Sequence, residues 1–369
     1  MITNSPTGDY QSAGRRRASR AKRLLVGVAS VAVLGLIAWP VMSYYEIPPF
    51  TDKGDPVSYG GGGTDNANGG KGSADSKVLM PTGPQADFKN EKTLPDGTHV
   101  SVVKLDGKKS GFKGKVWVWA PKEYGDPKYA SSGFPVMIAL PGGPGNDGNY
   151  WSVGEFGPQK LSLEKSISQW YQEGRSKPFL LAMPILNPGP DDKGIYWDAS
   201  DIPNQPKMGT WLTEDVPDLM KANFRTIKSR DGWSYMGSST GGFASLKSVL
   251  KHPDKFKTAI ANGPDIVPDS PLWRGHEKEK AENNPEVLAK QLEAAKGPDV
   301  YIAFQYGSKE NAKMIADVKK FTATYGKGPV HTKTWEIPGG THNGGTYLSN
   351  MAEPMKWISE QMEGPVPAS

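Results

Sequence analysis

Short apolar runs alternate with amphipathic stretches along the chain from about residue 86 to its end. The run FPVMIAL at 134–140 is almost continuously apolar, which is typical of a central strand covered on both faces. Similar runs predict further strands at 99–105, 112–120, 179–183, 232–236, 256–261, 300–306 and 332–337. Helical spacing predicts helices at 210–227, 243–250, 277–295, 309–325 and 347–362, the first becoming regular only near Pro217. This alternation predicts an α/β fold with a mostly parallel sheet flanked by helices.

A different pattern precedes this domain. Residues 24–45 (LLVGVASVAVLGLIAWPVMSYY) carry no charge and, as a helix, are long enough to cross a hydrocarbon core of ~30 Å. Basic residues lie directly before the run, so the positive-inside rule predicts that residues 1–23 form a cytoplasmic tail. No Ala-x-Ala site follows, which favours an uncleaved signal anchor over a signal peptide. The rest of the chain is therefore expected outside the cell membrane, with secretion after cleavage as the alternative.

Residues 46–85 are rich in Gly, Ser and Asp and include four consecutive glycines at 60–63. Such a composition buries too little apolar surface to order itself. We therefore predict a disordered linker over 46–85 and a catalytic domain over 86–365.

Charge and composition narrow the function classes. The formal net charge of +5 lies entirely in the first 23 residues, which hold six Lys and Arg against one acid. The remainder is formally neutral, so the sequence predicts no nucleic-acid partner. The chain has 369 residues and no cysteine, which excludes disulfides, thiolate catalysis and Cys-zinc sites. No P-loop, dinucleotide fingerprint or His-Glu-x-x-His motif is present, and no cofactor or metal is expected.

The segment GSSTGG at 237–242 fits Gly-x-Ser-x-Gly with Ser239 at its centre. In this motif the serine lies on a strained strand-to-helix turn, where side chains at Gly237 and Gly241 would clash. The N–H of the next residue, Thr240, then points at the oxyanion. A predicted strand precedes the segment and a predicted helix follows it, and the glycine spacing selects Ser239 over Ser238. A Gly/Ser-rich loop without chemistry is the alternative.

The segments ANFRTI at 222–227, GSSTGG at 237–242, LKHPDKF at 250–256 and AIANG at 259–263 resemble the putative esterase family of α/β hydrolases. That family includes esterase D-like hydrolases, feruloyl esterases and the mycolyltransferases of mycobacterial cell walls. The resemblance spans roughly residues 95–362 and implies an α/β-hydrolase fold with serine esterase or acyltransferase activity. Thr240 stands where the family often has Met, but only its backbone is required.

The loop PGGPGN at 141–146 follows the predicted central strand. In α/β hydrolases the loop at this place supplies the second oxyanion donor. Pro144 has no N–H, so Gly143 is the predicted donor, with Gly142 as the weaker choice and a plain turn as the alternative.

Four of the five histidines follow Ser239, as the triad order of this fold requires. His252 is too close to the serine in sequence, His276 lies in a charged segment, and His331 begins a strand. His342 lies in the loop PGGTHNGG at 338–345, between the last strand and the last helix. His342 is therefore the predicted general base.

The triad acid is expected after the strand at 300–306. Glu310 ends the segment GSKE at 307–310 and resembles the family's Gly-x-x-Asp. A helix N-terminal acid that only favours the dipole is the alternative role. Asp317 is expected to face elsewhere, and Asp265 is the second candidate.

The sequence thus predicts a serine esterase that acts through an acyl-enzyme. An acyltransferase on cell-envelope glycans and a non-catalytic surface binding module are the alternatives. An ester or an acyl-glycan is the expected substrate.

The insert at 187–208 is interpreted as a cap over the site or a polar loop. Four tryptophans would line a pocket there or belong to the core: Trp151, Trp197, Trp211 and Trp273.

Overall fold

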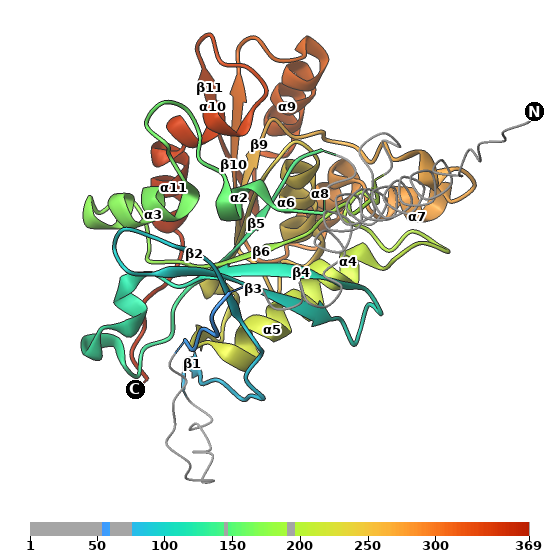
Figure 1. Cartoon of the computed structure of the whole chain (residues 1–369). Coiled ribbons are helices and arrows are strands. Elements are labelled where there is room, and N and C mark those ends of the chain that lie inside the picture. Colours follow the sequence, from blue (N-terminus) through green and yellow to red (C-terminus); the bar gives the residue numbers. More distant parts are fainter. Residues whose placement is uncertain (1–53, 60–75, 144–146, 190–195, 369) are drawn as a thin grey trace, which may run out of the picture. The chain divides into compact units, whose positions relative to one another are not determined.

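A computed structural model describes residues 54–59, 76–143, 147–189 and 196–368 (Figure 1). The predicted tail at 1–23 and the predicted membrane segment at 24–45 lie outside the described residues. Within the described ranges, no helix is long and apolar enough to cross a membrane.

A nine-stranded sheet in the order β11-β10-β9-β8-β5-β6-β4-β3-β2 forms the centre of the domain. The strands β6, β5, β8, β9, β10 and β11 are parallel, and β4, β3 and β2 extend one edge as antiparallel neighbours. The mostly parallel sheet that the sequence predicts is confirmed. The bounds are β2 Lys89–Thr93, β3 His99–Asp106, β4 Lys113–Trp119, β5 Val136–Leu140, β6 Leu180–Pro184, β8 Trp233–Ser238, β9 Thr258–Asn262, β10 Val300–Gly307 and β11 Val330–Ile337.

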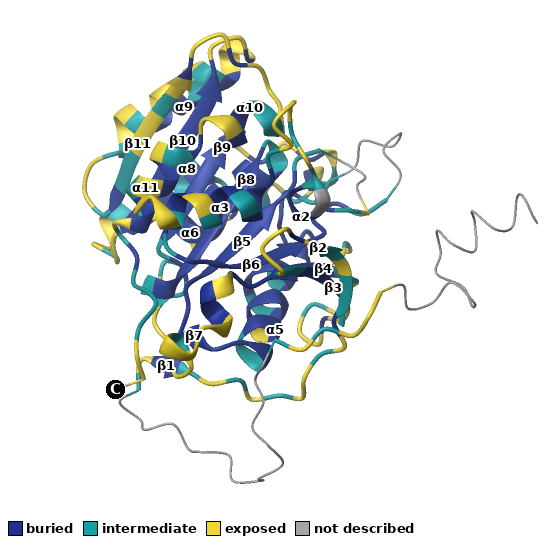
Figure 2. Ribbon diagram, turned by 60° about the vertical axis from the view of Figure 1, so that its left-hand side comes forward, coloured by how far each residue is buried: buried dark blue, intermediate teal, exposed yellow. Residues whose placement is uncertain are grey.

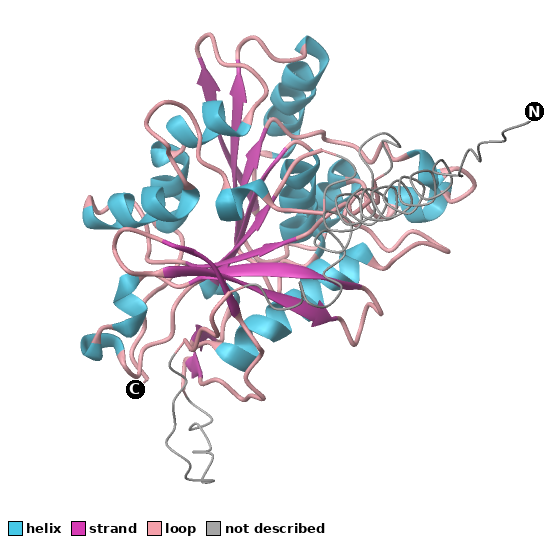
Figure 3. Ribbon diagram, viewed as in Figure 1, coloured by secondary structure: helices cyan, strands magenta, loops and turns pink. Residues whose placement is uncertain are grey.

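Helices cover both faces of this sheet (Figure 3). Alternate residues of a strand point to opposite faces, and β5 shows this directly. Val136, Ile138 and Leu140 join the core under one helical layer, while Met137 and Ala139 join the core under the other. The first layer has α5 Val216–Asn223, α6 Thr240–Lys251, α8 Pro285–Ala294 and α9 Ala312–Tyr325, and the second has α3 Leu163–Gln172, α10 Gly344–Ser349 and α11 Ala352–Ser359. The central strands are accordingly buried throughout (Figure 2).

The domain begins earlier than the predicted boundary at residue 86. Tyr59 donates a hydrogen bond to Ser101 Oγ (2.8 Å), and its ring lies 4.9 Å from that of Phe224. The short strand β1 (Val78–Leu79) pairs with β7 (Thr226–Ile227). Residues 55–59 and 76–85 therefore belong to the folded domain, because a few apolar side chains within the polar stretch pack against its core. Residues 46–53 and 60–75 of the predicted linker lie outside the described residues.

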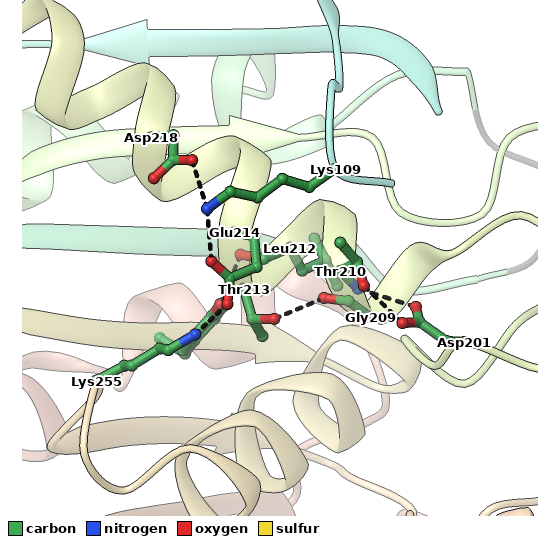
Figure 4. Close-up of polar contacts among 10 residues, drawn as sticks. Lys109, Asp201, Gly209, Thr210, Leu212, Thr213, Glu214, Asp218 and Lys255 are labelled. Atoms are coloured by element: carbon green, nitrogen blue, oxygen red, sulfur yellow. Dashed lines mark hydrogen bonds and ion pairs between the residues drawn. The ribbon is translucent and has the colours of Figure 1, made fainter. Parts of the chain in front are cut away.

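The predicted helix at 210–227 is three consecutive segments. After α4 (Met208–Thr210) comes a π-helical turn, Trp211–Asp215, and then α5, with Pro217 in its first turn as the sequence predicts. Figure 4 shows how polar side chains hold this region. Asp201 accepts hydrogen bonds from the N–H and hydroxyl of Thr210 (2.9 and 2.6 Å), and Glu214 pairs with Lys109 and Lys255. The insert before the helix is thus joined to the helix start.

Two other predicted helices are divided. Asn284 caps a new helix at Pro285, so 277–295 forms α7 (Glu277–Ala281) and α8. The predicted helix at 347–362 likewise forms two helices, α10 and α11, separated by residues 350–351.

Candidate active site

Ser239 lies on the sharp turn between β8 and α6. Its backbone has φ 57° and ψ −121°, a conformation that side-chain-bearing residues rarely adopt. The turn is held by bonds on both sides: Ser239 N–H donates to Asn262 O (2.8 Å), and Phe243 N–H donates to Ser239 O (2.9 Å). The turn leaves Ser239 half-buried at the carboxyl end of the parallel strands, directly before the N-terminus of α6.

Close backbone approach explains the two glycines of the motif. A Cβ on Gly237 would lie 2.3 Å from Gly241 O, and a Cβ on Gly241 would lie 2.5 Å from Leu140 O and Pro141 O. Because these obstacles are backbone atoms, they cannot turn aside as a side chain would. The glycine spacing is thus a steric requirement of the turn itself.

His342 and Glu310 lie in hydrogen-bond contact. Glu310 Oε2 is 2.6 Å from His342 Nδ1, and Glu310 Oε1 accepts the Gly307 N–H at 2.5 Å. The Glu310 side chain is completely buried, whereas that of His342 is 46% exposed. The hydrogen bond that His342 donates to Glu310 raises the pKa of His342 above its ordinary value, against the opposing effect of burial. An ionised carboxylate only accepts, so it keeps the proton on Nδ1 and leaves Nε2 free.

Tyr347 is a member of this group that the sequence did not indicate. Its hydroxyl lies 2.9 Å from His342 Nδ1, and the two rings are nearly perpendicular. The Tyr347 side chain is fully buried, and burial raises the pKa of its hydroxyl. It therefore remains a neutral hydroxyl beside the histidine.

Among the described residues, none of the other candidates forms a hydrogen bond with His342 or Glu310. Asp265 contributes only an electrostatic effect on His342, and Asp317 pairs with Lys313 (2.6 Å). His331 lies 3.0 Å from Asp299, and His252 caps the end of α6. Of the candidate acids, Glu310 is the one within hydrogen-bond distance of the His342 imidazole.

The two predicted oxyanion donors come from different elements. Thr240 is the first residue of α6, and Gly143 follows β5. The Gly142 N–H donates to the Tyr150 hydroxyl at 2.8 Å. The Gly142 N–H therefore already has a partner within the protein. Gly143 remains the stronger candidate for the second oxyanion donor.

Ser239 and His342 line two cavities. One of about 470 Å³ is lined by charged residues that include Asp265, Asp269 and Lys313, together with apolar residues such as Met314. The other, of about 310 Å³, is lined by residues that include Gly143, Tyr150, Phe156 and Tyr347. Of the four tryptophans considered for a pocket, three belong to the core: Trp151, Trp211 and Trp273.

Gly263→Ala is expected to damage this site. A Cβ there would lie 2.2 Å from the Tyr347 hydroxyl, 2.7 Å from Glu310 Oε2 and 2.9 Å from His342 Cε1, and the residue has φ 50°. We expect activity to fall at least about 10-fold, because a displacement of about 1 Å in such a group costs that much or more. Thermal unfolding and ester turnover are the measurements.

Gly275→Ala is the matched control for that change. Gly275 also has a positive φ, 82°, but a Cβ there would meet nothing within 4 Å. Both variants bear the left-handed backbone cost of about 1–2 kcal/mol, and Gly275→Ala should keep its activity. Equal activity losses in the two variants would contradict the steric explanation.

Residues 110–349 match the protein family described as "Putative esterase". The chain is 22% identical over 299 residues to an uncharacterized protein of Corynebacterium glutamicum, covering 75% of this chain and 66% of that protein. It is 29% identical over 140 residues to S-formylglutathione hydrolase of Mus musculus, covering 34% and 48%. The chain therefore spans just under two thirds of the first relative and about half of the second.

Solved structures share the fold at low identity. A ferulic acid esterase is 16% identical with a TM-score of 0.57, over 72% of this chain and 99% of that chain. A fluorophosphonate-binding serine hydrolase of Staphylococcus aureus is 15% identical with a TM-score of 0.55, over 71% and 98%. Together with the sheet order, these likenesses show an α/β-hydrolase-type fold. Since the family match covers more than half of the sequence, the chain belongs to this esterase family of the α/β hydrolases.

Proposed function

We propose that this protein is a serine esterase in which Ser239, His342 and Glu310 form the catalytic triad. The observation that carries the proposal is the contact of 2.6 Å between the buried Glu310 and His342, because His342 lines a cavity together with Ser239 on its strained turn. The family membership and the relatives named as hydrolases or esterases support ester hydrolysis. S-formylglutathione is a thioester, so we propose thioesters as a second class of acyl donor for this site.

The proposed chemistry is that of a serine, histidine and acid triad. Ser239 Oγ attacks the ester carbonyl and passes its proton to His342 Nε2, while Glu310 stabilises the imidazolium. The N–H groups of Thr240 and Gly143 hold the oxyanion. The imidazolium then protonates the leaving alcohol, and water repeats the sequence on the acyl-enzyme, which releases the acid and free Ser239.

Hydrolysis of p-nitrophenyl acetate, butyrate and octanoate by the purified full-length chain tests this proposal. We expect turnover and labelling of Ser239 by a fluorophosphonate. A folded protein with neither property would favour the non-catalytic binding module. Labelling without turnover would indicate a sound triad with a more demanding substrate.

An alcohol acceptor in place of water is the second candidate function. Two cavities meet at Ser239 and His342, and each offers a separate wall for an acyl group or an acceptor. Turnover of a labelled acyl donor with and without added trehalose or glycerol distinguishes the two. Products that never include a new ester would exclude the transferase.

Activity is expected to decline on the acid side with a midpoint above pH 6.5, the ordinary pKa of histidine. The reason is that Glu310 raises the pKa of His342, which must be unprotonated to accept the serine proton. The effect on stability has the opposite sign: protonation of His342 stabilises the fold below pH 6.5, and this gain is lost as pH rises through the raised pKa. The pH profile of kcat/KM gives the midpoint, and a midpoint below 6.5 would contradict the assignment.

We further propose that residues 24–45 anchor the protein and that the domain lies outside the cell membrane. The uncharged run and the six basic residues before it support this orientation. Protease added to intact cells should digest the domain, and the protein should stay with membranes after an alkaline wash. Recovery of intact protein in the wash supernatant would contradict the anchor.

A further inference from the structure

One buried side chain touches both of the proposed oxyanion donors. Asn187 follows β6 and is 2% exposed. Its amide nitrogen donates to Gly143 O at 3.2 Å and to Thr240 Oγ1 at 3.4 Å. Thr240 Oγ1 also donates to Gly143 O at 3.5 Å, so the three residues form a closed set of contacts.

These contacts hold the peptide that carries the Gly143 N–H. The Gly142 N–H on one side of that peptide is bonded to the Tyr150 hydroxyl (2.8 Å), and the Gly143 carbonyl on the other side is bonded to Asn187. Glycine has no side chain to restrict its dihedrals. Without Asn187, a loop of consecutive glycines would therefore retain freedom at the point where an oxyanion donor must be fixed.

The orientation of the Asn187 amide is itself determined. Its oxygen, Oδ1, accepts the Trp197 N–H at 3.2 Å, which turns the amide nitrogen toward Gly143. An aspartate here would have the same shape but would present a second acceptor to the Gly143 carbonyl. It would also add negative charge beside the place where the oxyanion forms.

The segment that orients Asn187 is firmly attached to the domain. Lys247, on the same helix as Thr240, is 3% exposed and donates to Ala199 O, Asp198 O (3.2 Å) and Ser200 Oγ (2.8 Å). Asp198 Oδ2 accepts from Trp273 Nε1 at 2.6 Å. A buried ammonium group requires such partners, and here they connect the segment to α6.

We infer that Asn187 is a positioning residue that holds the oxyanion donors Gly143 and Thr240 in place. Residues 197–200 of the insert at 187–208 then serve to orient Asn187, and through it the oxyanion loop. The inference rests on the proposed function, because it concerns the donors of the same reaction. It predicts a loss of transition-state stabilisation with little change in ground-state binding.

The test compares the full-length protein with Asn187→Asp and Asn187→Ala. We expect kcat for p-nitrophenyl butyrate to fall by about 10- to 100-fold with KM within about 2-fold, less than the loss of a whole donor. A trifluoromethyl ketone gives the second readout. Ser239 Oγ bonds to its carbonyl carbon, the serine proton goes to His342, and the resulting oxyanion requires the donors. Its Ki should rise by the factor by which kcat/KM falls.

Asn223→Ala is the matched control, because Asn223 is also buried and bonds to Leu219 O (2.8 Å) and Ala86 N–H (2.7 Å). It should lower the melting temperature and leave kcat and Ki unchanged. Unchanged kcat in both Asn187 variants, or lower kcat with an unchanged Ki, would overturn the inference. If the parent protein is not labelled by a fluorophosphonate, the proposed function fails as well. An active parent with unaffected variants would contradict the role of Asn187 alone.

Discussion

Replacement of Ser239 by alanine is expected to lower kcat/KM for p-nitrophenyl esters by at least about 10⁴-fold. The variant lacks the nucleophile, so no acyl-enzyme forms, and only oxyanion stabilisation and binding remain. Fluorophosphonate labelling should disappear with the activity. Alanine at a position with φ 57° keeps the same backbone cost as serine, so the melting temperature should change little.

Ser248→Ala is the control for that experiment. Ser248 lies on α6, the helix that follows Ser239, about two turns from its start, and is 1% exposed. The substitution removes a serine hydroxyl, as Ser239→Ala does. It should retain activity and labelling. Residual activity in Ser239→Ala close to that of the parent would mean that hydrolysis arises from another residue, and the proposed triad would be wrong.

The nucleophile turn could be predicted because its determinants are local. Gly237 and Gly241 lie two residues on either side of Ser239, and the clashes that require them arise within the turn and with the neighbouring β5. The order of strands and helices around it follows from apolar periodicity. Consequently the fold class and the position of Ser239 were accessible without a structure.

The contacts of the other site residues depend on tertiary structure. Glu310 and His342 are 32 residues apart and meet because the parallel pair β10 and β11 ends at the same edge. Sequence order suggested Glu310 but kept Asp265 open. Tyr347 and Asn187 gave no signal at all, since neither belongs to a motif and each acts through a partner on another element.

Boundary errors have equally physical causes. The predicted linker contains Val57 and Tyr59, whose side chains pack against the core although the surrounding composition is polar. The predicted helix at 277–295 ignored the Asn284-Pro285 pair, where an asparagine cap and a proline begin a new helix. Predictions from average composition over a segment miss the effect of single residues. The boundaries in the fold depend on such single residues, here Tyr59 and the Asn284-Pro285 pair.

The second large effect is expected at Glu310. Its buried carboxylate is the group in contact with His342 Nδ1, so Glu310→Gln should lower kcat/KM by about 10³- to 10⁴-fold. A glutamine amide can donate to Nδ1, which favours the tautomer with the proton on Nε2, where the base must be free. The glutamine oxygen can still accept the Gly307 N–H, so the fold should persist.

Asp265→Asn is the comparison that separates the two candidate acids. Asp265 lines the cavity beside His342 and acts on it only through its charge, so its loss should cost less than about 10-fold. In Glu310→Gln the remaining activity should also show an acid limb shifted to lower pH, because the group that raises the pKa of His342 is gone. The opposite ranking, with Asp265→Asn the more damaged variant and an unshifted limb in Glu310→Gln, would move the acid to Asp265. Each substitution removes one carboxylate charge near His342, but only Glu310→Gln also removes the acceptor at Nδ1, so the ranking of the two variants identifies the carboxylate that contacts the imidazole.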